Sequence, residues 1–167
     1  MDGDGDDDEV RLLLDGSDAD EPAEGTLETR LGSGEVRTAD VPIGYAPDAL
    51  TAAPIDDAGR REYVLLEHTQ GGDSAQLLVY GWVGDALVQL RAPRRVPLML
   101  ELDGEGRVAD WFVGDRGLVS WLRREPVDGA VHRVDLWSWG VEGDRLVPVE
   151  DGQACVDVTS EDRPRPC

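Results

Sequence analysis

The chain has 167 residues, of which 40% are hydrophobic, and 36 acidic residues against 16 basic ones give it a formal net charge of −20. This apolar content excludes wholesale disorder, and the length allows one domain or a few small repeats. No apolar stretch approaches the roughly 20 residues of a membrane-spanning helix, and so negative a surface repels phosphate backbones. We therefore expect no membrane span and no nucleic-acid partner.

Short runs of β-forming residues alternate with Gly, Pro and Asp clusters along the chain, and helical periodicity is absent beyond a single turn. The runs expected to form strands are 10–14, 26–31, 35–41, 62–68, 76–83, 86–90, 97–102, 111–113, 118–123, 131–141 and 145–149. Gly32-Ser33-Gly34 and Gly84-Asp85 are the expected turns of two hairpins. The sequence therefore predicts an all-β protein.

The expected strands repeat in three units, each with an extended approach, an acid- and glycine-rich turn, a strong strand and a hairpin. Asp2, Asp56 and Asp103 occupy equivalent positions in the three turns. A period of about 50 residues is typical of propeller blades and similar stacked sheets. We expect antiparallel blade-like repeats, forming a partial or atypical β-propeller, within one β-rich domain. The unit boundaries are about 1–53, 54–100 and 101–150, followed by a tail at 151–167.

The opening stretch MDGDGDDDEV has two interpretations. It is either a solvated acidic tail or most of a calcium loop that leads into the strand after it. Calcium takes six to eight oxygen ligands, and acids at alternate positions converge on such an ion. In the second interpretation Asp2, Asp4 and Asp8 supply carboxylates and Asp6 supplies its carbonyl oxygen. The first ligand position then falls one residue before Met1.

The third turn, ELDGEGRVAD, keeps acids at three ligand positions, Glu101, Asp103 and Glu105. It is either a weaker calcium site or a plain turn. The second turn, within 54–62, has only two carboxylates at ligand positions, so we expect it to be free of metal. Calcium is the one cofactor that these patterns suggest.

The run DGDGDDDEV before a strand resembles the FG-GAP or VCBS-type repeat, whose consensus is approximately D-x-D-G-D-G-x-x-D. The segments YAPDALTAAPIDDAG and RRVPLMLELDGEG resemble the approach strand and loop of the same family. More loosely, the whole chain resembles VCBS-like repeat proteins of the actinobacterial secreted or lipoprotein type. The resemblance implies propeller-like blades, calcium in the blade loops and an exported binding or adhesion role.

Cys155 and Cys167 are the only cysteines and lie outside any CxxC motif, which favours a disulfide over a metal site. A disulfide would tie the C-terminal tail to the last strand. It would also indicate an oxidising, extracytoplasmic location, either secreted or attached to the cell envelope. The sequence contains no recognisable export signal.

The five tryptophans suggest an alternative function of another class. On an extended strand Trp137 and Trp139 share one face, as do Tyr80 and Trp82. Such aromatic pairs either stack on sugar rings or fill the space between packed sheets. A cell-wall glycan is therefore the alternative to a partner protein as the ligand.

No catalytic motif is visible in the sequence. Asp103 and Glu105 lie on a metal-type loop, which disfavours them as a pair of glycosidase carboxylates. Ser120 lies in GLVSW, which lacks the G-x-S-x-G pattern of a nucleophile elbow. We therefore expect a non-enzymatic module with a structural or protein-interaction role.

Overall fold

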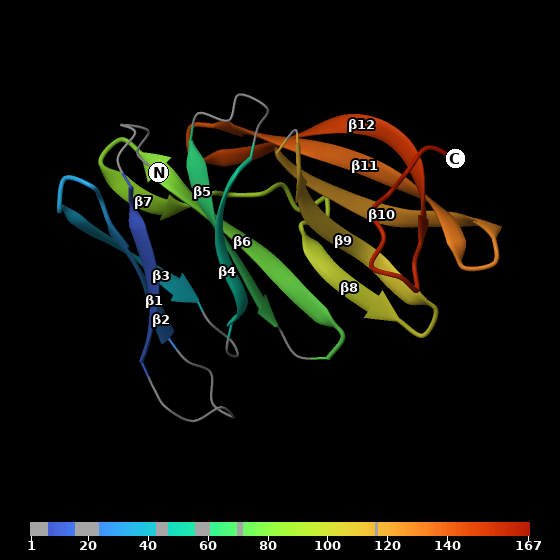
Figure 1. Ribbon diagram of the computed structural model, residues 1–167, viewed down its shortest axis with the longest axis horizontal. Helices are drawn as coiled ribbons and strands as arrows, with labels where there is room; N and C mark the ends of the chain where they lie inside the picture. Colours follow the sequence, from blue (N-terminus) through green and yellow to red (C-terminus); the bar gives the residue numbers. More distant parts are fainter. Residues whose placement is uncertain (1–6, 16–23, 43–46, 56–60, 70–71, 116) are drawn as a thin grey trace.

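The computed structural model describes residues 7–15, 24–42, 47–55, 61–69, 72–115 and 117–167. Within these ranges the chain forms antiparallel β-sheets and no helix, so the all-β prediction is confirmed (Figure 1). A helix long and apolar enough to cross a membrane is accordingly not found in the described residues. The strands are β1 (Glu9–Asp15), β2 (Glu24–Arg30), β3 (Val36–Pro42), β4 (Pro47–Pro54), β5 (Glu62–Thr69), β6 (Ser74–Val83), β7 (Ala86–Gln89), β8 (Met99–Asp103), β9 (Gly106–Gly114), β10 (Gly117–Asp128), β11 (Val131–Glu142) and β12 (Arg145–Asp157).

Three strands form a small sheet in the order β1-β2-β3. Its middle strand alternates, so that Leu27 and Thr29 are fully buried while their neighbours in sequence are more exposed. Leu27 packs with Val64 and Tyr80 of the large sheet. The small sheet therefore covers one face of β5–β7, as its position beside them in Figure 1 shows.

The remaining strands form one large sheet in the order β12-β11-β10-β9-β8-β6-β5-β4, with β7 paired to β6 beside this path. Strand β5 is buried on both faces because it lies between two layers. Val64 and Leu66 pack under the small sheet, whereas Leu65 belongs to a second core on the opposite face. A strand buried on both faces is expected to be a continuous apolar run, and YVLL fits this expectation.

The large sheet curls around this second core. The core brings together residues from strands that are far apart in the sheet, among them Leu65, Leu118 and Trp139. Where β4 ends, Ile55 accepts a hydrogen bond from the backbone N–H of Leu118 at 2.9 Å, which links the two halves of the sheet. Among the described residues, the path of paired strands ends at β4 and at β12.

Two-residue turns join several of the hairpins, and the turn predicted at Gly84-Asp85 is one of them. Gly84 and Gly143 each take the first turn position with positive φ, 60° and 61°. A type II′ turn requires this conformation, and glycine adopts it without steric cost. These two turns set the pairing of β6 with β7 and of β11 with β12.

The expected unit boundaries can be located on the strands. The strands between residues 47 and 157 lie in one sheet, and the boundary at residue 53 falls inside β4, which pairs with β5. The division into three units stays a prediction. The propeller-like arrangement remains an interpretation of the sequence repeats.

The outer face of β9–β12 carries a third cluster of buried apolar residues, including Trp121, Val134 and Val158. Residues 158–167 leave β12 and fold back over this face, and we call them the strap. Figure 1 shows this red segment beside β9 and β10. The strap and the strands beneath it form a cleft.

Candidate functional site

A cleft of about 700 Å³ lies between the outer face of β8–β10 and the strap. Leu100, Phe112 and Trp121 supply apolar surface from three neighbouring strands, and residues 158–163 form the facing wall. Such a volume is in the range of pockets that hold small ligands or a few side chains. We call it the strap cleft.

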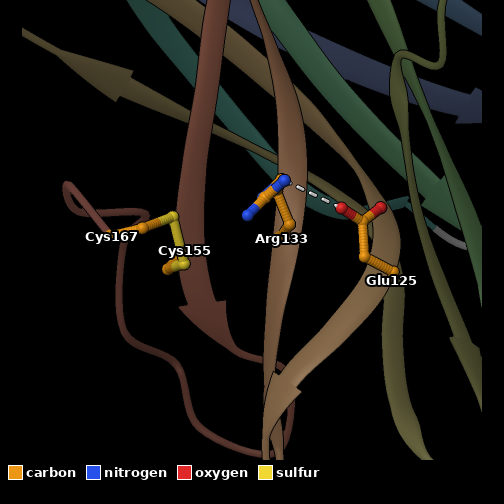
Figure 2. Close-up of a disulfide and its surroundings, with 4 residues drawn as sticks. All are labelled: Glu125, Arg133, Cys155 and Cys167. Carbon is orange, nitrogen blue, oxygen red and sulfur yellow. Dashed lines mark ion pairs between the residues drawn. A yellow bond between two sulfur atoms is a disulfide. The ribbon is translucent and has the colours of Figure 1, made fainter.

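A disulfide and a pair of backbone hydrogen bonds fasten the end of the strap. Cys155 in β12 is bonded to Cys167, with the two Cα atoms 5.1 Å apart (Figure 2). Cys155 and Arg165 also exchange backbone hydrogen bonds of 2.8 and 2.9 Å. The predicted cysteine pairing is therefore the one found, and it ties the tail back to the last strand as expected.

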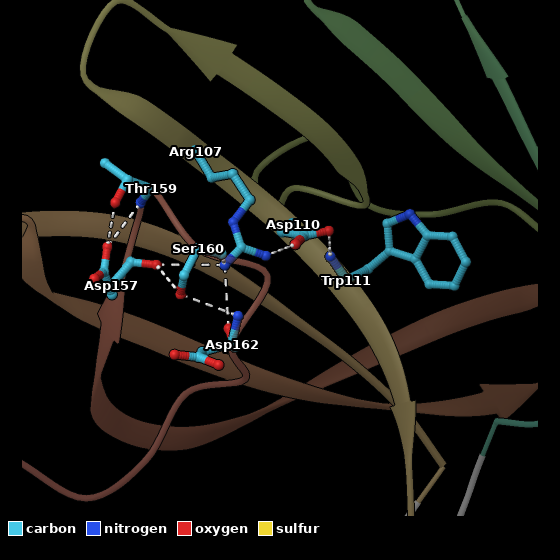
Figure 3. Close-up of polar contacts among 7 residues, drawn as sticks. All are labelled: Arg107, Asp110, Trp111, Asp157, Thr159, Ser160 and Asp162. Atoms are coloured by element: carbon cyan, nitrogen blue, oxygen red, sulfur yellow. Dashed lines mark hydrogen bonds and ion pairs between the residues drawn. The ribbon is translucent and has the colours of Figure 1, made fainter.

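Arg107 fastens the middle of the strap (Figure 3). Its Nη1 lies 2.6 Å from a carboxylate oxygen of Asp110, while its Nη2 donates to the carbonyl oxygens of Asp157, Ser160 and Asp162. Only 13% of the Arg107 side chain is exposed. A planar guanidinium has several N–H donors in a fixed fork, so one side chain can bind several backbone carbonyl oxygens at once.

The start of the strap is a tight turn stabilised by the side chain of Asp157. Its carboxylate accepts hydrogen bonds from the hydroxyl of Thr159 at 2.7 Å and from the Thr159 backbone N–H at 2.9 Å. The hydroxyl and then the backbone bond hold the pKa of Asp157 below its ordinary value of 3.8. The carboxylate therefore remains ionised and bonded across the neutral and mildly acidic pH range.

Gly106 allows the strap to approach β9 closely. The backbone N–H of Arg107 donates to Val158 O at 2.9 Å. A Cβ atom added to Gly106 would lie 2.5 Å from the same carbonyl oxygen, and the residue has φ of +125°. Both the contact and the backbone conformation require glycine here.

The rim of the strap cleft is acidic. Glu105, Glu161 and Asp162 are exposed lining residues, and Arg163 is the exposed lining residue of opposite charge. The guanidinium of Arg163 lies over the Phe112 ring, 5.0 Å from its centroid. An arginine therefore already occupies the aromatic surface at the edge of the cleft.

The residues predicted to form the first calcium loop are mostly outside the described residues. Asp2, Asp4 and Asp6 fall there, whereas Asp8 is described and its Oδ1 accepts a hydrogen bond from the Gly32 backbone N–H at 3.0 Å. In the described ranges no three or more His, Cys, Asp or Glu side chains gather in a way that could hold a metal. Calcium at this loop stays a prediction.

The third turn, which was predicted as the weaker calcium site, is arranged around the side chain of Arg123. Asp103 accepts hydrogen bonds from both terminal nitrogens of Arg123 and from the backbone N–H of Glu105. The carboxylate of Glu105 lies 3.9 Å from the same guanidinium. The bond from Arg123, followed by the backbone bond, lowers the pKa of Asp103. Glu101 lies in β8 outside this contact, so only two of the three predicted residues come together.

The tryptophans lie mainly in the cores. Trp121 and Trp139 are 1% and 2% exposed, and Trp82 and Trp111 pack at the edges of the cores on either side of the large sheet. The indole nitrogen of Trp139 donates to Ser120 Oγ at 3.0 Å, which explains why that serine is buried. Trp137 is half-buried. These positions favour the interpretation that the tryptophans fill space between strands.

Arg107 and the strap cleft were not found by sequence reasoning. The only sequence signal was the cysteine pair, which indicates that the tail folds back but does not indicate the surface that it covers. Arg107 stands in the third turn, where a metal loop would offer a backbone carbonyl, and no pattern marks its side chain as a strap contact.

Comparison with known proteins adds no assignment: no protein-family model, no curated protein and no solved structure matches the chain. The resemblance to FG-GAP and VCBS-type repeats therefore rests on the sequence motifs alone.

Proposed function

We propose that this chain is a non-enzymatic binding module of an exported or envelope-attached protein, and that the strap cleft receives a cationic, partly apolar segment of a partner protein. The observation that carries the proposal is the stacking of Arg163 on Phe112 beneath an acidic rim. This internal contact supports the idea that guanidinium groups suit the cleft. Aromatic faces attract cations, and the rim carboxylates add to that attraction.

The polar groups around the cleft support a binding role over a catalytic one. Arg107 is engaged with Asp110 and with the strap carbonyls, and the Asp157 carboxylate is engaged with Thr159. A general acid, base or nucleophile must be within reach of a substrate in a suitable protonation state. The ionisable groups held in place here maintain the shape of the cleft instead.

The disulfide supports the expected location. A Cys155–Cys167 bridge persists in an oxidising compartment such as the cell exterior, the periplasm or the envelope surface, and is rare in a reducing cytosol. We propose that the module functions there. The strap, and with it the strap cleft, then depends on the redox state of its surroundings.

A peptide titration tests the proposed function. The probe is a fluorescein-labelled hexapeptide amide that alternates arginine and leucine, compared with its glutamate–leucine counterpart by fluorescence anisotropy. We expect the cationic peptide to bind and its affinity to fall at least tenfold in the triple variant Glu105→Gln, Glu161→Gln, Asp162→Asn. Loss of three nearby charge contacts is sufficient for such a change.

A matched control is needed because a chain of net charge −20 attracts any cation. The triple variant Glu28→Gln, Glu35→Gln, Glu62→Gln removes the same charge from residues outside the strap cleft. We expect it to bind the cationic peptide within a factor of about two of the parent, since distant exposed charges are largely screened. Equal loss of affinity in both triple variants would reject the strap cleft as the binding site.

A further inference from the structure

A second surface, away from the strap cleft, is rich in arginine. The connection between β7 and β8 crosses the molecule and meets the β11–β12 hairpin. Arg91 and Arg145 are bridge partners there, with backbone hydrogen bonds of 3.0 Å from Arg91 N to Asp144 O and 3.1 Å from Leu146 N to Arg91 O. This pairing places two arginines from distant parts of the sequence next to each other.

Two crevices open on either side of this crossing. One, of about 380 Å³, is lined by Arg145, Pro93, Pro148 and neighbouring apolar residues. The other, of about 350 Å³, leads towards the core residues Leu77 and Leu98. Arg91, Ala92 and Leu146 line both crevices. The site therefore combines charged heads at the surface with apolar side chains behind them.

The arginines of this surface carry more positive charge than their neighbours neutralise. Arg91 forms an ion pair with Asp144. Arg94, Arg95 and Arg145 are exposed and form no ion pair within the described part of the chain. Arg145 lines the first crevice, and Arg94 and Arg95 directly follow its lining residue Pro93. Glu142 and Asp144 are the acids at the turn of the adjoining hairpin. A local positive surface therefore exists on a chain whose net charge is −20.

We propose that this surface binds a single-chain amphipathic carboxylate, with the carboxylate on the arginines around Arg145 and the aliphatic chain in the crevice beside Leu146. The guanidinium fork matches a carboxylate in geometry and is weakly hydrated, so it binds such a group at modest desolvation cost. Covering an alkyl chain with the apolar crevice walls removes its surface from water, which favours binding. A ligand with only a charged head would leave the apolar floor uncovered, and a ligand with only an alkyl chain would leave the arginines without a partner.

The net charge of the whole protein allows binding by local charge to be separated from binding by the general electrostatic field. A general electrostatic field of a −20 chain favours cations over anions of the same size. A preference for the anion can therefore arise only from local charge. Two ligands with equal alkyl chains and opposite heads separate the two effects.

The test uses isothermal titration calorimetry with decanoate and decylammonium below their aggregation concentrations, on the full chain at low ionic strength. We expect decanoate to bind at least tenfold more tightly than decylammonium. The variant Arg94→Gln, Arg95→Gln, Arg145→Gln should lose at least tenfold in decanoate affinity. Acetate at the same concentrations should show no measurable binding, because it lacks the chain.

A control variant removes the same number of charges from other places. Arg30, Arg124 and Arg133 lie outside both crevices and outside the connection between β7 and β8 that carries Arg94 and Arg95. Their joint change to glutamine should leave decanoate affinity within a factor of about two. Near-UV circular dichroism confirms that both variants keep the parent fold. Tighter binding of decylammonium, or an equal loss of decanoate affinity in both variants, would overturn the proposal.

Discussion

Arg107 lies over the ring of Trp121, with its guanidinium carbon 5.4 Å from the ring centroid, and the same guanidinium donates to the carbonyl oxygens of the strap. One side chain therefore contacts both the floor and the wall of the strap cleft. Because Trp121 is itself 1% exposed and packed in the outer cluster, the arginine has a rigid support. The contact links the strap to the strands beneath it.

Replacing Arg107 should release the middle of the strap. Arg107→Leu removes the donor to Asp110 Oδ2 and to the carbonyl oxygens of Ser160 and Asp162, so we expect a loss of about 2 kcal/mol in the free energy of unfolding. Arg107→Lys keeps the charge but lacks the planar fork, and should recover less than half of that loss. Urea denaturation measures both values, and hydrogen exchange at the strap amides should accelerate in parallel.

A second arginine provides the control for this change. Arg124 forms an ion pair with Asp135 but is 43% exposed, so Arg124→Leu should cost less than about 1 kcal/mol and leave strap exchange unchanged. If Arg124→Leu and Arg107→Leu destabilise the chain equally, Arg107 has no special role in holding the strap.

Removing the disulfide should loosen the end of the strap. The bond closes a short loop, with the cysteines 12 residues apart, and the loop-entropy model assigns about 3 kcal/mol to such a closure. We expect the double variant Cys155→Ser, Cys167→Ser to lose roughly 1–3 kcal/mol in the free energy of unfolding. Amide exchange at Arg165, whose N–H bonds to Cys155 O, should increase more than exchange in β5. Unchanged exchange at Arg165 would show that the backbone pair holds the strap without the bond.

Stability should fall with rising pH through the titration of Tyr80. Burial, followed by the nearby carboxylate of Asp40, raises the pKa of Tyr80 from 10 to about 12. The folded state therefore keeps the phenol proton when the unfolded state has lost it, so this contribution is fully present below about pH 10 and is lost towards pH 12. Between roughly pH 9.5 and 11.5, the urea midpoint of the Tyr80→Phe variant should decline less steeply than that of the parent protein. Parallel declines in the two proteins would contradict this assignment.

Calcium should stabilise the chain if the opening aspartates form a metal loop. A dissociation constant of roughly 0.1–1 mM is typical of extracellular modules. By mass action, 1 mM calcium then raises the free energy of unfolding by about 0.4–1.4 kcal/mol. Asp4→Asn should abolish the shift, and magnesium should not reproduce it. An unfolding midpoint that is the same with and without calcium would contradict the calcium loop and favour the solvated acidic tail.

The strand positions were the most predictable feature of the fold. Alternation and turn residues marked eleven runs, and a strand overlaps each of them. Strand β4, Pro47–Pro54, was absent from those runs because its composition is rich in alanine and proline and low in β-branched residues. It is a strand because it pairs with β5, a tertiary contact that local propensity does not report.

The pairing of distant strands was less predictable than the strands themselves. Hairpins follow from local turns, so the pairing of β6 with β7 could be read from Gly84-Asp85. The pairing of β6 with β8 joins Ser74 to Glu101, although the rest of β6, strand β7 and the connection after it lie between them in the sequence. No local pattern specifies this pairing. The number of sheets depends on such contacts, which the repeats in the sequence do not specify.

The candidate site was predictable only at its covalent end. Composition identified Cys155 and Cys167 as partners, and the structure joins them. The acidic loop at Asp103 was expected to attract a cation, and the cation beside it is the side chain of Arg123. A protein with many arginines can supply such charges itself, and the sequence alone does not show which arginine reaches which loop.

The most direct test of the proposed function observes the floor of the strap cleft during peptide binding. The five tryptophans can be replaced by 5-fluorotryptophan and their ¹⁹F resonances assigned by single Trp→Phe changes. At saturating arginine–leucine peptide, we predict a shift of the Trp121 resonance with the Trp139 resonance unchanged, since Trp121 lines the cleft and Trp139 lies in the opposite core. An unchanged Trp121 resonance at saturation would contradict binding in the strap cleft.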